Sequence, residues 1–418
     1  MWQRVPVPAE PQPPSVVSSG TADPLRALLG ASRLLTADRL ADEVDAAGRL
    51  LGASESVVYL ADYEQALLLP LTGPGAPARQ ELAVDRTVAG MAYRRTETMR
   101  SPAPHAGGGP RQERVWVPLL AGSERLGVLE LVVPSGGQGL EDEARLFAAV
   151  VAGLVVTLGG QTDEFARLRR RKTLTLAAEI QWELLPPLAF TGHRVAVAGA
   201  LEPAYEIGGD TFDYAVDGDT VHLMVLDAMG HGLGAALLAS AAVGAYRHAR
   251  RGLLDLPDTA AAVDAVIAQE FGPERFATGV LASLDTSTGR LRWVNAGHPP
   301  PLVLRDSGLV QVAACPPDLP LGLQEVKPQT CETALQPGDR VLLYTDGIVE
   351  ARSPAGEFFG EQRLCDFVIR SAGAGFPAPE MLRRLMREVL AHQADQLQDD
   401  ASVVALEWRA DQEHPPAP

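Results

Sequence analysis

Four aspartates constrain this chain more than any other feature, because each lies at the end of a strand-like run or in a tight turn. Two of them end apolar runs, and three have a glycine within three residues. They are Asp210 in EIGGD, Asp227 in VHLMVLDAMGHG, Asp346 in RVLLYTDG and Asp399 in QDDAS. A carboxylate on backbone that turns sharply offers the oxygen ligand that hard cations such as Mg²⁺ and Mn²⁺ prefer. The sequence therefore predicts one shared acidic site.

Composition narrows the class of protein. The chain has 418 residues, of which 46% are hydrophobic and 21% are charged, so we expect two or three domains with separate cores. A net charge of −17 argues against nucleic acid or an anionic membrane as the main partner. The longest apolar run, at 146–160, is too short to span a bilayer comfortably and predicts a buried helix.

Cysteine use and the N-terminal sequence together predict a cytoplasmic location. Cys315, Cys331 and Cys365 show no CxxC spacing, which is typical of unpaired thiols in a reducing compartment. The first residues, MWQRVPVPAEPQPP, contain no apolar segment of the kind that a secretory signal needs.

The first half of the chain predicts a tail followed by an α+β domain. Residues 1–20 are rich in Pro and Ser, so we expect a disordered tail. Residues 21–160 then run through a helical pattern, two strands, a hairpin and a closing helix, at 23–51, 56–73, 113–134 and 141–159. This order resembles a GAF sensory domain, and the resemblance implies a small-molecule ligand or another signal. A dimerisation domain without a ligand stays open as the alternative.

Residues 161–190 predict a helical linker. Apolar side chains between Phe165 and Leu184 fit one face of a helix, and Pro186 ends it. The basic cluster at 167–172 is expected on the solvated face of that helix and not on nucleic acid. Because helices of this kind often pair across a dimer, we expect a homodimer in which the linker carries a signal to the second half of the chain.

Residues 191–410 predict an antiparallel β-sandwich flanked by helices. The runs at 193–204 and 211–227 are expected to form sequential antiparallel strands, with Asp217–Asp219 as a hairpin turn. A second hairpin, a buried strand and a last strand follow, and helices are predicted at 232–251, 258–271, 360–371 and 378–394. Residues 411–418 are expected to form a flexible tail.

The order of several short segments is more specific than any one of them, because a lone GGD or TDG is usually only a turn. In chain order they are EIGGDTFDY, VLDAMGHGLGAALLA, FATGVLASLD, NAGHPPPLVL, LPLGL, GDRVLLYTDGIVEAR and QDDASVVAL. Together they resemble the SpoIIE branch of metal-dependent protein phosphatases, which is akin to the protein phosphatase 2C superfamily. The resemblance covers about 180–408.

The resemblance implies an activity and a set of ligands. Two Mn²⁺ or Mg²⁺ ions would activate a water that hydrolyses phosphoserine or phosphothreonine, often on a phosphorylated anti-anti-sigma factor and under the control of an N-terminal sensor. Asp210, Asp227 and the carbonyl of Ala228 would bind metal. Asp346 would complete a metal site with Asp399, and the neighbouring carboxylate at 400 would support them.

Two histidines have less certain roles. His231, in the AMGHG turn, lies either near the phosphate or in a purely structural position. His298 is expected to pack a loop near the site. All four aspartates are present, which favours an enzyme over the alternative of a catalytically silent phosphoprotein-binding scaffold or sensor with the same fold.

Overall fold

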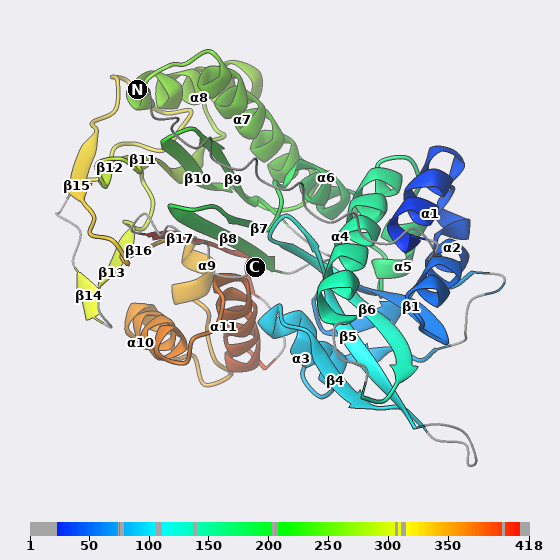
Figure 1. The fold of residues 1–418 in the computed structure, drawn as a ribbon. Helices are drawn as coiled ribbons and strands as arrows, with labels where there is room; N and C mark the ends of the chain where they lie inside the picture. The colour runs from blue at the N-terminus through cyan, green and yellow to red at the C-terminus, as the bar shows by residue number, and fades with distance from the viewer. Residues whose placement is uncertain are drawn as a thin grey trace, which may run out of the picture.

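The computed structural model describes residues 23–73, 75, 79–104, 111–136, 140–202, 205, 208–305, 308–310, 315–394 and 398–409. The chain builds two units, each around its own sheet or sheets (Figure 1). The N-terminal unit comprises the described residues up to 159, and the C-terminal unit comprises those from 189 to 409. The tails predicted at 1–20 and 411–418 lie outside the described residues.

The N-terminal unit is a six-stranded antiparallel sheet with helices on both faces. The strands follow the order β3 (Leu82–Ala83), β2 (Leu67–Pro70), β1 (Glu55–Ala61), β6 (Glu124–Pro134), β5 (Gln112–Ala121) and β4 (Met99–Pro102). The helices are α1 (Pro24–Ala31), α2 (Ala37–Leu50), α3 (Val88–Arg95) and α4 (Leu140–Gly159). These bounds confirm the predicted strand pair, hairpin and closing helix, whereas α3, β3 and β4 were not predicted.

Alternation along the strands divides the N-terminal unit into two cores. On β5, Val115, Val117 and Leu119 face α2 and α4, whereas Trp116 faces the side that carries α3. Successive side chains of a strand point to opposite faces, so one apolar strand serves both cores. Tyr93 of α3 completes the second core.

The C-terminal unit is a sandwich of two antiparallel sheets with helices outside both of them (Figure 1), as the sequence predicts. The first sheet has the order β15 (Cys331–Ala334), β12 (Arg290–Ala296), β11 (Ala277–Asp285), β10 (Thr220–Ala228) and β9 (Asp210–Asp217). The second has the order β14 (Gly308–Val310), β13 (Leu302–Arg305), β16 (Arg340–Tyr344), β17 (Ala401–Trp408), β8 (Val195–Glu202) and β7 (Ala189–Thr191). The flanking helices are α7 (Leu233–Arg251), α8 (Leu256–Phe271), α9 (Asp346–Val349), α10 (Gly360–Gly373) and α11 (Ala378–His392).

One strand does not pair as the sequence predicts. β9 and β10 form the expected hairpin through Asp217–Asp219, but β8 joins the other sheet and pairs with β17, about 200 residues later. β8 and β9 face each other across the sandwich instead, since a Cβ added at Gly199 would lie 2.3 Å from the Phe212 ring. The two sheets enclose a core in which Phe212 and Trp293 are fully buried.

The predicted single linker helix is wrong, because the segment forms two short helices, α5 (Glu164–Arg169) and α6 (Leu176–Leu184). Arg167, Arg171 and Lys172 are exposed to solvent, as predicted, but several basic side chains of the segment also contact the N-terminal unit. Arg169 donates to the carbonyl of Ala61 at 2.8 Å, and Lys172 pairs with Glu64 at 3.0 Å. These contacts favour an extended backbone between the two helices. The homodimer, which was predicted to form through a continuous helix, stays a prediction.

A buried ionic cluster joins the two units at α11. Glu380 is fully buried and accepts from Arg383 at 2.8 Å, and Arg125 of β6 lies 3.4 Å from the same carboxylate. Arg383 in turn binds Asp85 of the N-terminal unit at 2.6 Å. Although burial opposes ionisation, hydrogen bonds from Arg383 and Arg384 lower the pKa of Glu380. The cluster therefore holds charged groups from both units out of water.

The cysteines differ from the prediction of three unpaired thiols. Cys315 and Cys331 form a disulfide, with Cα atoms 6.1 Å apart, whereas Cys365 is free and buried. The bond ties the edge strand β15 to the segment that precedes it. The two cysteines are 16 residues apart in the sequence, and only the fold brings them within bonding distance. Across the described part of the chain, no helix is long and apolar enough to cross a membrane.

Replacing Glu380 by alanine should destabilise the protein more than removal of an exposed carboxylate does. Loss of one member of a buried ionic group leaves the others uncompensated and costs about 3 kcal/mol or more. The matched control is Glu43→Ala, which breaks a 3.8 Å pair between the partly exposed Glu43 and the exposed Arg39 and should cost less than about 1 kcal/mol. Urea denaturation followed by circular dichroism measures both, and equal small losses would contradict a stabilising role for the cluster.

Candidate active site

Strand pairing brings the four predicted aspartates to one end of the sandwich. Asp210 opens β9 and Asp227 stands near the end of β10, where the two residues are direct partners in the antiparallel register. In the other sheet, Asp346 follows β16 and Asp399 precedes β17, and these strands pair in the register that sets Tyr344 against Val403. Each sheet thus supplies two carboxylates.

Glycines let the two sheets approach each other at this end. Asp400 accepts hydrogen bonds from the backbone N–H groups of Gly208 and Gly209 at 2.6 and 2.8 Å. A Cβ at Gly347 would lie 1.7 Å from the carbonyl oxygen of Asp400, and one at Gly209 would lie 2.1 Å from that of Ala228. Because no side chain fits there, the turns that carry the aspartates need glycine.

Thr345 is a positioning residue that the sequence did not single out. Its hydroxyl donates to Asp210 at 2.6 Å and accepts from the backbone N–H of Ser402 at 2.9 Å. Thr345 is fully buried and Asp210 is 3% exposed. The hydroxyl therefore fixes one carboxylate of the first sheet to the backbone of the second.

Burial, and after it the neighbouring carboxylates, raises the pKa of several acidic groups at this end of the sandwich. Burial and then the charges of Asp346 and Asp399 raise the pKa of Asp227 to about 7. Burial and then Asp227 raise the pKa of Asp210 well above its usual range, which the hydrogen bond from Thr345 partly offsets. Burial is also the main reason that the pKa of Asp400 rises to about 6. Such shifts mark anions that lack a compensating cation.

The donor set fits a hard cation in its chemistry but is not closed around one. Every side chain that the sequence predicts as a ligand offers oxygen, as Mg²⁺ and Mn²⁺ require. Among the described residues, however, no group of three His, Cys, Asp or Glu side chains converges tightly enough to hold a metal. Asp399 is exposed, whereas Asp210 is buried. The aspartates are nevertheless near enough to repel one another, since the charges of Asp346 and Asp399 contribute to the raised pKa of Asp227.

The two histidines differ in surroundings. His298 is buried, with Nδ1 2.9 Å from the Thr278 hydroxyl and Nε2 3.1 Å from the carbonyl of Tyr344. Burial lowers the pKa of His298 to about 4, so the ring is neutral, donates from Nε2 and accepts at Nδ1. This confirms the expected packing role. His231 is exposed in its turn, which leaves both alternatives for it open.

Arg275 is a second residue that the sequence analysis missed. Its guanidinium donates to the carbonyl of Met229 at 3.4 Å, beside the turn that follows Asp227. The backbone N–H of Met229 donates to Phe276 at 3.0 Å and holds the two segments together. Arg275 is exposed and forms no ion pair with any described residue. Its only signal in the sequence is a position directly before the strand-like run FATGVLASLD.

A protein-family model matches most of the C-terminal unit. Residues 217–409 match the model described as Stage II sporulation protein E (SpoIIE). The C-terminal unit therefore contains a SpoIIE-type domain over these residues. The match covers three of the four aspartates, and Asp210 lies seven residues before it.

Curated relatives agree with this family. Phosphoserine phosphatase RsbP of Bacillus subtilis is 26% identical over 192 residues, which is 44% of this chain and 47% of RsbP. Phosphoserine phosphatase RsbU of the same organism is 23% identical over 248 residues, or 56% of this chain and 70% of RsbU. Protein IcfG of Synechocystis is 26% identical over 271 residues, 56% of this chain and 41% of IcfG. The chain thus spans less than half the length of IcfG and RsbP.

Two solved structures are similar in part. The RsbU and RsbW domains of Rv1364c from Mycobacterium tuberculosis align at a TM-score of 0.46 and 27% identity, covering 55% of this chain and 64% of that one. The SiaA-PP2C domain of Pseudomonas aeruginosa aligns at 0.47 and 21%, covering 56% of this chain and 94% of that one.

Replacing Asp227 by asparagine should stabilise the metal-free protein at neutral and higher pH. The pKa of Asp227 is about 7 in the folded protein, against an ordinary value of 3.8. Between these pH values the folded state therefore binds more protons than the unfolded state, and the contribution of Asp227 to stability falls as the pH rises. We expect a gain of about 1–3 kcal/mol at about pH 8 and little change near pH 4.

Urea denaturation in EDTA across this pH range measures the effect. The control is Asp142→Asn, whose carboxylate is 92% exposed and should change the stability little at any pH. An Asp227→Asn protein that is less stable than the wild type at high pH would contradict the repulsion inferred for the site.

Proposed function

We propose that this chain is a metal-dependent protein serine/threonine phosphatase that hydrolyses phosphoserine or phosphothreonine on a regulatory protein. The observation that carries the proposal is the meeting of four carboxylates at one end of the sandwich, none of which has an ion pair among the described residues. Two Mn²⁺ or Mg²⁺ ions would supply the missing positive charge. Their proposed ligands are Asp210, Asp227, the carbonyl of Ala228, Asp346 and Asp399.

The residues of the chain would hold the reactants in place. Bound dications of this kind lower the pKa of a water and stabilise the charge of the phosphoryl oxygens. Thr345 fixes the orientation of Asp210, and Asp400 holds the Gly208–Gly209 turn through two N–H groups. Arg275, free of carboxylate partners in the described chain, is placed to donate to a phosphoryl oxygen of the substrate.

Exposed apolar side chains next to the site favour a protein substrate over a small ester. Met229 follows the Asp227 turn, and Leu233 and Leu237 lie four residues apart on α7. Their exposed fractions are 43%, 44% and 48%. Such a surface suits contact with another protein. The names of RsbP and RsbU, both phosphoserine phosphatases, support phosphoserine, and the family resemblance suggests an anti-anti-sigma factor.

The N-terminal unit is proposed to be a GAF-like sensor that gates the phosphatase within a cytoplasmic homodimer. Its helix and strand order supports this, as do its contacts with α11. The alternative remains a catalytically silent scaffold or sensor that binds a phosphoprotein without turnover. Turnover and binding distinguish the two.

Activity should depend on Mn²⁺ or Mg²⁺ and on the aspartates. We expect the full chain to hydrolyse p-nitrophenyl phosphate and a phosphoserine peptide only with the metal, and Asp227→Asn and Asp346→Asn each to lower kcat/KM by about 100-fold or more. Asp142→Asn serves as the control that keeps full activity. Binding of the phosphopeptide without metal-dependent turnover would replace this proposal with the scaffold alternative.

Arg275→Gln should weaken the use of substrate without loss of metal binding. Removing a charge-assisted hydrogen bond to phosphate should lower kcat/KM by about 10- to 100-fold, mostly through KM. Arg275→Lys should recover part of it, because lysine keeps the charge but not the fork of donors. Steady-state kinetics with Mn²⁺ titrations test this, and an unchanged KM in both variants would remove Arg275 from the site.

A further inference from the structure

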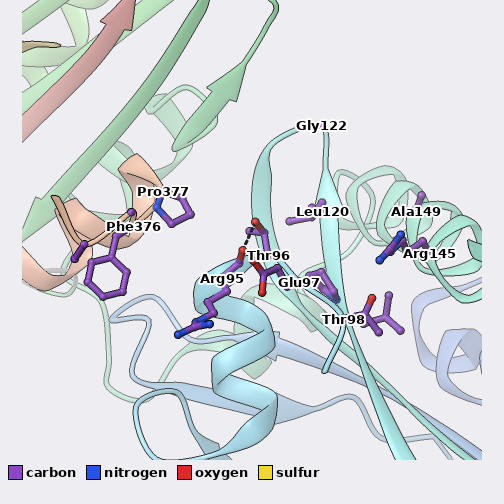
Figure 2. Close-up of a pocket in the computed structure, with 14 residues that line it drawn as sticks. Arg95, Thr96, Glu97, Thr98, Leu120, Gly122, Arg145, Ala149, Phe376 and Pro377 are labelled. Carbon is purple, nitrogen blue, oxygen red and sulfur yellow. Dashed lines mark hydrogen bonds between the residues drawn. The ribbon is translucent and has the colours of Figure 1, made fainter. Parts of the chain in front are cut away.

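A cavity of about 920 Å³ lies between the two units, well away from the aspartates. One wall is the turn between α3 and β4, another is the outer edge of β5, and a third is the loop at 374–377 that leads into α11. Figure 2 shows Phe376 and Pro377 of this loop across from Thr96 and Leu120. The volume is that of sites that take small organic molecules.

The position of the cavity follows from how the sheet is packed. Beneath α3, the sheet face is filled by Tyr59, Tyr93 and Trp116, which are at most 4% exposed. The opposite face is filled by α2 and α4. Space remains at the edge of β5, since β4 pairs with it only as far as Trp116. Val117 and Leu120 lie beyond that pairing and line the cavity.

Positive charge gathers on one side of this seam, in a chain whose net charge is −17. Burial and then the neighbouring Arg383, Arg384 and Arg95 lower the pKa of Arg94, against the opposing effect of Glu380. Arg95 forms no ion pair with any residue that the structure describes. The charged residues that line the cavity are two arginines and one carboxylate, Arg95, Arg145 and Glu97. The guanidinium of Arg384 adjoins the cavity through Phe376, which also lines it.

An apolar surface adjoins the arginines. The Phe376 ring stacks on the Arg384 guanidinium, 3.8 Å from its ring centroid, and Pro377 stands beside it. Ala149 of α4 lies at the other end, near Arg145 (Figure 2). A flat group can therefore lie on apolar side chains while an anionic group reaches the guanidiniums.

We propose that this cavity is the binding site of a small organic anion that carries a flat apolar group, and that its occupancy reaches the phosphatase domain through α11. The binding step is independent of the activity proposed above, whereas its effect on turnover rests on that activity. The site is separate from the filled sheet face under α3.

The path to the aspartates runs through packed elements. The loop at 374–377 continues directly into α11, which also carries Glu380 and Arg383 of the ionic cluster. Leu382 and Leu385 of α11 lie in one core with residues of β8 and β17. β17 begins two residues after Asp399. A ligand that draws the loop toward the α3–β4 turn would thus act on the helix that supports the strand next to the site.

Two probes that differ only in charge test the binding step on the full chain. 8-Anilinonaphthalene-1-sulfonate is a flat apolar molecule with one anionic group, and N-phenyl-1-naphthylamine lacks the sulfonate. Fluorescence titration should show the anionic probe binding at least about 10-fold more tightly. Ala149→Trp, which fills the cavity from the exposed side of α4, and Arg95→Glu should each weaken it by about 10-fold or more.

Arg33→Glu provides the control, since it makes the same change of charge at an exposed position outside the cavity. It should leave the affinity within about twofold. Equal binding of the two probes, or affinities that Ala149→Trp and Arg95→Glu do not change, would overturn the proposed site.

Hydrogen exchange separates the path from the activity. With the anionic probe bound, amides of 374–392 should exchange more slowly in the wild type and not in Ala149→Trp. If the amides do not respond although the probe binds in the cavity, the path through α11 is wrong. If they respond but no metal-dependent turnover exists with or without the probe, the site stands and the proposed function fails.

Discussion

The burial of neighbouring carboxylates is the constraint around which one end of the C-terminal unit is built. Four aspartates are held at one end of a sandwich, and burial, followed by the neighbouring charges, raises the pKa of Asp210, Asp227 and Asp346. Much of the local structure offsets the cost of this burial: the Thr345 hydroxyl, the two N–H groups that bind Asp400, and turns so close that only glycine fits. Bringing these carboxylates together therefore lowers the stability of the protein at the pH values where they are ionised.

Local patterns allowed much of this architecture to be predicted. Hairpins such as β9–β10 and β5–β6 have short turns between strands of regular periodicity. The four aspartates could be assigned to one site from the order of the short segments that contain them. The predictions that were wrong concern contacts between residues far apart in the sequence. The partner of β8 lies about 200 residues later, and the linker breaks where Arg169 and Lys172 find acceptors in another unit. Thr345 and Arg275 carry no pattern, because their roles come only from where two segments meet.

The two units are joined by polar contacts more than by an apolar interface. Glu380, Arg383 and Arg125 are almost wholly buried, and Glu380 binds Arg383 of its own helix as well as Arg125 of the N-terminal unit. Such a seam has few alternative arrangements of similar energy, because any displacement must leave a charge without a partner. The cluster therefore favours one or a few discrete placements of α11 over a continuous range of placements.

The position of β17 has a consequence for how the protein is made. This strand lies at the centre of its sheet, between β16 and β8, and it also follows directly on Asp399 and Asp400. During synthesis β8 emerges about 200 residues before its partner, so the nascent chain carries an apolar strand with an open edge for a long interval. Closure of the sheet and completion of the acidic site then coincide in one late event. The four aspartates therefore cannot meet at one end of the sandwich before β17 has joined its sheet.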